Sequence, residues 1–336
     1  METNIQIMSN QQPNSQGSHH HPTHRNQSYQ KQIWAIGGGK GGVGKSLVSS
    51  SLAFTLAKFG LSTIVVDLDL GGANLHTVLG QNPPQKCLSD FINGNVHSLS
   101  ECVVETHYPH LKMIAGAKDD LKITQITDGT KETLLDQIKK LNAQFIILDL
   151  GAGTSQYTLD FFNLAHAGIV TVLPEPTSIE NSYRFLKAVY YNRLLQDSRF
   201  ESIQPLINAA MTPNNQLGIH TPTDLLNEVN FQNPELAVEL KKTIKEFKPK
   251  LVLNQTRSQT DVDVGFSMKS VAKKYFGIDL DYLGYLEYEP NVWQSVRRMR
   301  PILAEYPHSR IATHVERICN YLLKQARIEQ TLNEPI

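Results

Sequence analysis

Apolar residues along the chain fall into short runs separated by helix-length segments. The runs are rich in valine, isoleucine and leucine and are apolar almost without interruption, rather than alternating with polar residues. Strands of this kind are buried on both faces, which is typical of a parallel sheet covered by helices on each side. The pattern predicts a doubly wound α/β fold with a mostly parallel sheet of seven to eight strands. The expected strands are Ile33–Ile36, Thr63–Val66, Lys112–Ala115, Phe145–Leu148, Ile169–Leu173, Lys250–Leu253 and Tyr282–Leu286.

Two regions carry helical signals outside this alternation. The stretch 195–248 is longer than a minimal connection and predicts a helical insertion with helices at Thr223–Val229 and Pro234–Phe247. Asn233 is placed to cap the second of these helices, whose first residue is proline. Near the end of the chain, Ser309–Arg327 predicts a helix that packs by one side only. Its apolar stripe consists of Ile311, Val315, Ile318 and Leu322.

The two ends of the chain differ in composition from the rest. Residues 1–31 are rich in Asn, Gln, Ser and His and predict a disordered polar tail, because they have little apolar surface to bury. A metal site in this tail is the alternative, but no Cys or carboxylate completes one. Residues 32–327 are expected to form one domain, and residues 328–336 a flexible C-terminal tail. The histidines of the first tail are His19, His20, His21 and His24.

Composition narrows the class of protein. Among 336 residues, Lys+Arg and Asp+Glu both number 32, so the global charge does not attract nucleic acid or anionic lipid, and any such contact must be a local patch. The three cysteines, Cys87, Cys102 and Cys319, form neither a disulfide framework nor a CxxC pair. No apolar run approaches the ~20 residues that span a bilayer, and the N-terminus lacks a signal pattern. A cytoplasmic protein is expected.

A glycine-rich loop directly follows the first expected strand and precedes a helix. Residues 39–46 match G-x-x-x-x-G-K-[ST], in which backbone N–H groups surround phosphates and the helix N-terminus adds its positive dipole end. Lys45 is expected to contact the β- and γ-phosphates, and Ser46 to bind Mg²⁺ through its hydroxyl. A glycine-rich turn of another purpose is the alternative. The residues expected to bind ATP are Gly39, Gly41, Gly42, Val43, Gly44, Lys45, Ser46 and Leu47.

Three carboxylates follow apolar strands. Asp67 and Asp69 end the second strand and project toward the same side if strand geometry persists, so one can serve the Mg²⁺ shell and the other the attacking water. Asp149 follows Phe145–Leu148 in the Walker B pattern, in which the carboxylate supports the metal. A capping or turn role for Asp67, Asp69 or Asp149 remains the alternative. Ser46, Asp149 and one of the pair Asp67 and Asp69 are therefore the predicted metal ligands.

The extra lysine at the start of the loop makes the motif more specific. Lys40–Ser46 has the K-G-G-x-G-K-[ST] form and resembles the deviant Walker A motif of the MinD/ParA, Mrp and nitrogenase-iron-protein group. Asp67–Gly71 resembles the D-x-D-x-G motif of the same family. Asn74–Leu75 and Pro174–Ile179 are similar to the flagellar FlhG/FleN branch and to MinD, and the matching blocks cover most of residues 32–305. The resemblance implies a P-loop NTPase fold of the SIMIBI type.

The resemblance also implies roles for single residues. Lys40 would contact nucleotide across an ATP-dependent homodimer, with a solvated loop lysine as the alternative. Asp69 would orient or activate the attacking water, and Asp67 would belong to the metal's surroundings. Asn254 would contact adenine, with a turn residue as the alternative, and the backbone at Pro290 would lie beside the base.

The activity that the resemblance implies is slow, partner-stimulated ATP hydrolysis by a dimeric switch. Such a switch positions or numbers a cellular structure, such as the flagellum or the cell-division site. A ParA-type segregation ATPase for DNA or cargo is one alternative. A non-hydrolysing ATP-dependent scaffold for a transcriptional or polar partner is another, although the presence of Asp69 favours hydrolysis.

Departures from the family pattern bear on the partners. Residues 1–31 lack a DQAxxLR-like motif, so stimulation of an FlhF-like GTPase by that route is doubtful, and a transcriptional activator remains a candidate. Residues 328–336 do not form a basic amphipathic helix, which leaves contact with the inner face of the membrane or the pole weakly supported. Iron–sulfur transfer is disfavoured because no CxxC exists. Arg297, Arg298 and Arg300 form a cationic patch for which a protein partner or intramolecular ion pairs are preferred over DNA.

Overall fold

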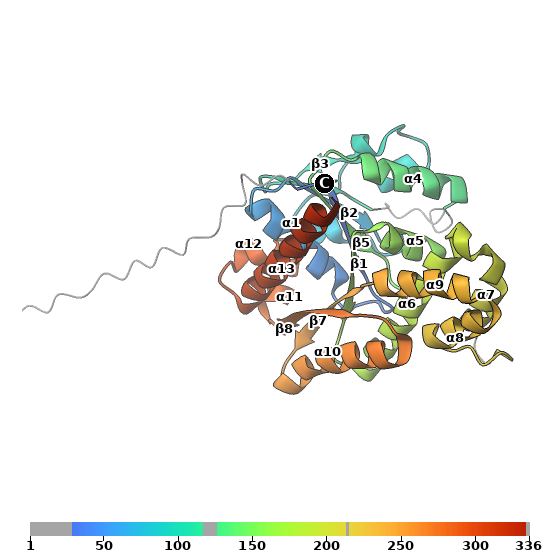
Figure 1. Ribbon diagram of the computed structural model, residues 1–336. Helices are drawn as coiled ribbons and strands as arrows, with labels where there is room; N and C mark the ends of the chain where they lie inside the picture. Colours follow the sequence, from blue (N-terminus) through green and yellow to red (C-terminus); the bar gives the residue numbers. More distant parts are fainter. Residues whose placement is uncertain (1–28, 117–125, 213–214, 334–336) are drawn as a thin grey trace, which may run out of the picture.

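An eight-stranded sheet forms the centre of the computed structural model, which describes residues 29–116, 126–212 and 215–333 (Figure 1). The strand order is β3-β4-β2-β5-β1-β6-β7-β8. Neighbouring strands are parallel except β3 and β4. This confirms the doubly wound, mostly parallel sheet. The strands are β1 (Gln32–Gly37), β2 (Thr63–Leu68), β3 (Val104–Glu105), β4 (Leu111–Ile114), β5 (Phe145–Leu150), β6 (Ala167–Val172), β7 (Lys250–Thr256) and β8 (Asp281–Glu287).

The central strands are apolar without interruption because both faces of the sheet are covered. In β1, Ile33 and Ala35 belong to one apolar cluster, and Trp34 belongs to the cluster on the opposite face. The Trp34 ring meets Phe145 of β5 edge to face at 5.1 Å between centroids. Each such strand buries two rows of side chains, so polar residues occur mainly where the strand ends. The site described below lies at those ends.

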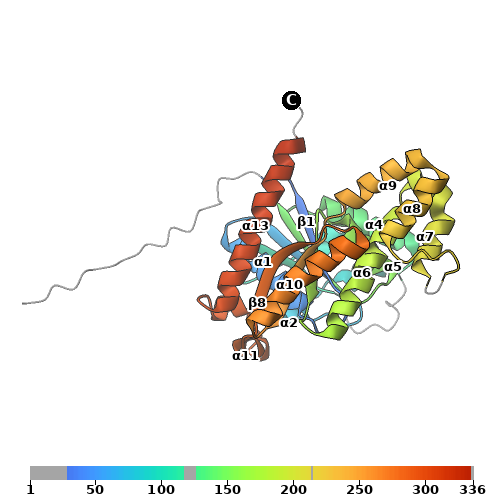
Figure 2. The same cartoon turned by 60° about the horizontal axis from the view of Figure 1, so that its bottom comes forward.

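Helices cover the sheet in two layers, which Figures 1 and 2 show from different directions. No helix in the part of the chain that the structure describes is long and apolar enough to cross a membrane. One layer contains α1 (Lys45–Lys58), α2 (Leu75–Val78), α12 (Ile302–Glu305) and α13 (Arg310–Asn333). The other contains α3 (Leu88–Ile92), α4 (Asp128–Lys140), α5 (Gln156–Leu164), α6 (Pro176–Leu195), α7 (Gln204–Met211), α8 (Pro222–Gln232), α9 (Pro234–Glu246) and α10 (Gln259–Val271), whereas α11 (Asn291–Arg297) follows the last strand.

The two helices predicted within residues 195–248 correspond to α8 and α9. Asn233 caps α9, since its side-chain oxygen accepts the Leu236 N–H at 3.1 Å. The sequence did not reveal α7 or the 3-10 turn η4 (Ser198–Ile203) that precedes it. In Figure 2, α7, α8 and α9 form a group at one side of the molecule, far from α1 and α13.

Both predicted tail boundaries need correction. Tyr29 is buried, its ring packs edge-on against Phe145 at 5.4 Å, and its hydroxyl accepts a hydrogen bond from Arg327 at 2.9 Å. The folded region therefore includes residues 29–31. The last helix continues to Asn333, six residues beyond its expected end at Arg327, although its predicted apolar stripe is buried as expected. Residues 1–28, with the four histidines of the predicted tail, lie outside the described residues.

Gly168 offers a test of how tightly α5 packs on the sheet. A Cβ at this position of β6 would lie 2.4 Å from Cε1 of Phe162, whose ring is held edge-on by Phe185. We expect Gly168→Ala to lower the free energy of unfolding by about 1–3 kcal/mol, because overpacking a buried site forces its neighbours to shift. Urea denaturation measures the change.

Gly129→Ala is the matched control. Gly129 lies in α4 with nothing within 4 Å of an added Cβ, so the substitution should be neutral or stabilising by up to ~1 kcal/mol. Equal stability of the Gly168→Ala variant and the wild type would show that Phe162 moves without cost.

Candidate nucleotide-binding site

The loop between β1 and α1 forms an open cradle of backbone groups. Gly42 and Gly44 adopt φ values of 77° and 92°, a left-handed conformation that favours glycine. Gly44 is the N-cap of α1, and no side chain caps this helix end. The first N–H groups of α1 therefore lack a side-chain partner and, with the helix dipole, suit an anion. Nothing lies within 4 Å of a Cβ built at Gly41 or Gly42, so the outer side of the loop is open.

Lys45 is the first residue of α1 and is only 7% exposed. Burial lowers the pKa of its ammonium group, whereas the carboxylates of Asp149 and Asp69 act in the opposite direction. A buried cation beside a phosphate cradle provides charge for an anionic ligand where water screens it little. Ser46 and Leu47 complete the first turn, and the Leu47 side chain packs against the apolar cluster beneath α1. Leu47 can therefore offer a ligand only its backbone.

Two buried carboxylates lie side by side where β2 and β5 end. The strand register pairs Asp67 directly with Asp149, and their side chains are 0% and 1% exposed. Asp67 accepts backbone N–H groups of Asp69 and Leu75, both at 3.1 Å. Burial, followed by the charge of Asp149, raises the pKa of Asp67 to about 8.

Asp149 is supported by serine hydroxyls rather than by backbone N–H groups. Burial raises its pKa to about 6, against the lowering effects of the Ser46 and Ser49 hydroxyls and of Lys45. The Ser49 hydroxyl lies 2.9 Å from Asp149 Oδ1. Two adjoining carboxylates in a low-dielectric environment hold protons more tightly than usual because both cannot be ionised without cost.

These residues fit a Mg²⁺ ion bound together with a phosphate. A divalent cation would neutralise the paired carboxylates, and the Ser46 hydroxyl already reaches the Asp149 carboxylate. Within the described ranges there is no cluster of three or more His, Cys, Asp or Glu residues that could hold a metal alone. This is in keeping with Mg²⁺ chemistry, since the ion keeps several waters and usually shares carboxylates with substrate phosphates.

Asp69 lies among the loops that follow β2 and β5. Its Oδ1 accepts the Gly71 N–H at 3.3 Å, and a Cβ at Gly151 would lie 3.3 Å from the same oxygen. Asp69 and Gly151 both line a cavity of about 450 Å³. The Gly153 N–H donates to the Gly38 carbonyl at 3.3 Å and so joins the loop after β5 to the start of the phosphate loop.

Asn254 contacts the phosphate loop in this structure, whereas the sequence predicts that it contacts adenine. It is 1% exposed, its Nδ2 donates to the Val43 carbonyl at 2.9 Å, and its Oδ1 accepts the Gln255 N–H. A Cβ at Gly44 would lie 2.1 Å from Nδ2, so this side chain supports the phosphate loop from below. Exposed Pro290 is the N-cap of α11. Contact of Asn254 or Pro290 with a base stays a prediction.

Lys40 lies on the outer part of the phosphate loop, partly exposed. Its ammonium donates to the Thr177 hydroxyl at 3.3 Å, at the start of α6. Gly39 is pressed against the same helix, because a Cβ there would lie 2.1 Å from the Asn181 carbonyl oxygen. In a single copy of the chain, the cation is therefore directed toward α6, and its predicted reach to a second nucleotide stays a prediction.

Sequence reasoning missed two polar residues of this region. Ser49 lies one turn along α1 from Lys45, and only the folded structure brings it to Asp149. Tyr157, at the start of α5, has a buried hydroxyl without a hydrogen-bond partner in the described structure. Burial and the charge of Asp67 raise the pKa of Tyr157. Serine after a P-loop and tyrosine in a helix are too common to single out without coordinates.

Comparisons with known proteins find relatives among P-loop NTPases. Residues 29–189 match the ParA family, described as the NUBPL iron-transfer P-loop NTPase. The antiactivator FleN of Pseudomonas aeruginosa is 24% identical over 281 residues, or 83% of this chain and 81% of FleN. The flagellum site-determining protein YlxH of Helicobacter pylori is 32% identical over 156 residues, or 46% of this chain and 52% of YlxH.

A solved structure shows the same fold. The septum site-determining protein MinD of Pyrococcus horikoshii, complexed with Mg-ADP, superposes with a TM-score of 0.60 at 20% sequence identity. The match covers 89% of this chain and 98% of that protein. At this level of identity, the likeness concerns the arrangement of strands and helices.

Ser49→Ala tests whether the Ser49 hydroxyl supports the metal carboxylate. Loss of this donor should raise the pKa of Asp149 further, and we expect Mg²⁺ affinity at fixed ADP to fall about tenfold. Isothermal titration calorimetry measures the Mg²⁺ affinity. Ser50→Ala is the control, since the Ser50 hydroxyl bonds only backbone carbonyls of α1. If Mg²⁺ affinity falls equally in the two variants, the cause is a change in helix α1 rather than the loss of the hydrogen bond to Asp149.

The raised pKa values of the carboxylate pair predict a pH dependence. Below the pKa values of Asp149 and Asp67, about 6 and about 8, the carboxyl groups are protonated and a cation must displace the protons. Mg²⁺ affinity should therefore strengthen as the pH rises through this interval, with proton release on binding. Calorimetric titrations in buffers of different ionisation enthalpy measure the Mg²⁺ affinity and the number of protons released. In Asp67→Asn, Mg²⁺ affinity should no longer depend on pH in the upper part of this interval. If the pH profile of Mg²⁺ affinity is unchanged in this variant, the dependence comes from titration of the nucleotide instead.

Proposed function

We propose that this chain, which belongs to the MinD/ParA family of P-loop NTPases, binds Mg²⁺ and ATP and works as a slow, ATP-hydrolysing homodimeric switch. The observation that carries the proposal is the combination of an uncapped helix N-terminus, buried Lys45 and the paired carboxylates of Asp67 and Asp149 in one place. Each part alone has a structural explanation, but together they suit a triphosphate with its metal.

Each residue of the site has a separate task in this proposal. The loop N–H groups and Lys45 bind the phosphates, and Ser46, Asp67 and Asp149 hold the metal. When bound, Mg²⁺ neutralises the charge that develops on the phosphates. Asp69 orients the attacking water through its second carboxylate oxygen, since Oδ1 already accepts the Gly71 N–H. The adjacent Gly151 leaves space beside this carboxylate for the water and the terminal phosphate.

The position of Lys40 supports the proposed dimer formation. The ammonium rests on a neutral hydroxyl, that of Thr177, rather than on a carboxylate. This contact is weak enough to exchange for the phosphates of a second copy, which are a far stronger partner for a cation. Gly41 and Gly42 are exposed with open space around them, so a second copy can approach the loop closely. A cation supplied by the other subunit couples association to the triphosphate state.

The cellular role is proposed from the relatives. FleN is named an antiactivator and YlxH a flagellum site-determining protein, so a role in placing or numbering a flagellum or marking a division site is the favoured one. Its partner would be an FlhF-like GTPase or a transcriptional activator. A DNA-bound role is less favoured, because Arg297 stacks on Trp293 and Arg298 pairs with Glu305, which leaves a small cationic surface.

Size-exclusion chromatography with ATP tests the switch. The wild type should shift to a dimer with ATP and return to a monomer as ATP is consumed. Lys40→Ala should stay monomeric, because it lacks the cation that reaches across. Asp69→Ala should remain trapped as a dimer with hydrolysis reduced by about 10²–10⁴-fold. Equal elution of all three proteins would exclude the proposed cycle.

Added ligands separate the remaining alternatives. If the trapped Asp69→Ala dimer is retained on DNA, a ParA-type segregation role replaces the favoured one. If it is retained on anionic vesicles, the membrane is the surface on which the dimer gathers. Arg184→Ala is a suitable control, since Arg184 forms an exposed ion pair with Glu180 in the same helix. It should behave as the wild type in every assay.

A further inference from the structure

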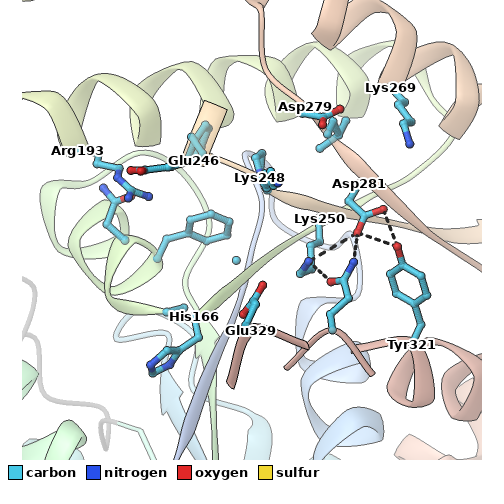
Figure 3. A pocket seen from close by; sticks show the side chains of 18 of the residues that line it. His166, Arg193, Glu246, Lys248, Lys250, Lys269, Asp279, Asp281, Tyr321 and Glu329 are labelled. Atoms are coloured by element: carbon cyan, nitrogen blue, oxygen red, sulfur yellow. Dashed lines mark hydrogen bonds and ion pairs between the residues drawn. The ribbon is translucent and has the colours of Figure 1, made fainter. Parts of the chain in front are cut away.

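A second cavity lies at the end of the sheet where the parallel strands begin, opposite the end that carries the phosphate loop. It has a volume of about 510 Å³ and is lined by residues at the start of three parallel strands, namely Gly168, Lys250 and Asp281. Figure 3 labels Lys250 and Asp281. The end of α5 and the last turns of α13 close it from the sides. A cavity of this size matches the ~300–1,000 Å³ typical of small-molecule sites.

One wall of the cavity is a closed polar network. Lys250 is only 8% exposed, lies 3.6 Å from the Asp281 carboxylate and donates to Gln325 Oε1. Gln325 in turn donates to Asp281 at 2.8 Å, and the Tyr321 hydroxyl donates to the same carboxylate at 3.3 Å. These groups satisfy one another and tie α13 to β7 and β8. They form a rigid polar wall that leaves Lys250 little capacity for a further partner.

The rest of the lining has charges of both signs whose side chains are not hydrogen-bonded into this network. The side chains of Arg193, Lys248, Glu246 and Glu329 line the same cavity and form no hydrogen bond or close ion pair with other described residues (Figure 3). The charge of Glu329 still acts on His166 and Lys250, and that of Arg193 acts on Asp197. These four residues are held apart because they come from α6, the segment before β7, the end of α9 and α13. Ile328, which is 51% exposed, adds apolar surface beside them, whereas the Phe162 and Phe247 rings are almost fully buried.

From this arrangement we propose that the cavity binds a small zwitterion with an apolar side group, of the size of an aromatic or aliphatic amino acid. Its carboxylate would meet Lys248 and Arg193, its ammonium Glu329, and its side group Ile328. The whole lining carries four Lys or Arg and four Asp or Glu residues. This balance disfavours polyanions such as nucleotides, which the opposite edge of the sheet suits.

The cavity is connected to the phosphate loop by elements that run between the two. β7 extends from Lys250 in the cavity wall to Asn254, which holds the Val43 carbonyl of the loop. His166 lines the cavity, and its Nδ1 accepts the N–H of Ile33 in β1 at 2.9 Å, the strand that leads into the loop. A ligand that shifts these strands would change nucleotide affinity, and nucleotide would change the ligand's affinity by the same factor.

Calorimetry with L-phenylalanine as the probe tests the site on the full chain without nucleotide. We expect saturable binding, with 3-phenylpropanoate, which lacks the ammonium group, and 2-phenylethylamine, which lacks the carboxylate, each about tenfold weaker or worse. Glu329→Gln should weaken L-phenylalanine but not 3-phenylpropanoate. Lys248→Ala should weaken L-phenylalanine but not 2-phenylethylamine. Lys324→Ala, an exposed change on α13 outside the lining, should have no effect.

Absence of saturable binding, equal binding of all three probes, or binding indifferent to both lining variants would overturn the proposal. The binding step does not rest on the proposed ATPase function, whereas the coupling to nucleotide does. Mg-ADP affinity is therefore measured on the same samples with and without L-phenylalanine. If the protein binds L-phenylalanine but no nucleotide, only the ATPase proposal is wrong. If it binds nucleotide normally but no L-phenylalanine, only the proposed zwitterion site is wrong.

Discussion

The register between β2 and β5 is the constraint on which the rest of the site depends. It places Asp67 opposite Asp149, and both carboxylates are buried. Two like charges in an apolar environment are costly, which appears as raised pKa values and as hydrogen bonds from backbone N–H groups and serine hydroxyls around them. Buried Lys45 offsets part of this charge. The site is thus arranged around negative charge that a cation would relieve.

Close packing between loops connects this charge cluster to its surroundings. The phosphate loop is held from below by Asn254, at a point where a Cβ on Gly44 would not fit. The loop after β5 touches it through Gly153 and lies against Asp69 through Gly151. Displacement of one loop by a ligand must therefore be accommodated by the others. The same strands continue to the far edge of the sheet, where the charged cavity lies, so the two sites share rigid elements.

Much of the architecture could be predicted because its cause is local. A strand buried on both faces must be apolar along its length, so the seven longer strands were recognisable from runs such as Phe145–Leu148. The phosphate loop was recognisable because glycine, lysine and serine at that spacing are required by backbone conformation and charge. Short β3 was missed, since two residues carry no periodicity. The end of α13 was placed too early because charged residues on an exposed helix face resemble a tail.

The sequence by itself determined the mostly parallel sheet, the succession of its longer strands along the chain, the phosphate loop and the carboxylates that end the strands. Only the tertiary structure decided which side chains meet across the chain. Asn254 reaches the loop from 211 residues away, Ser49 bonds Asp149 across 100 residues, and Tyr29 contacts Arg327 across 298. Local pattern follows from each residue's own burial and backbone preference. Contacts between distant segments depend on how whole layers pack, and no short stretch of sequence encodes that.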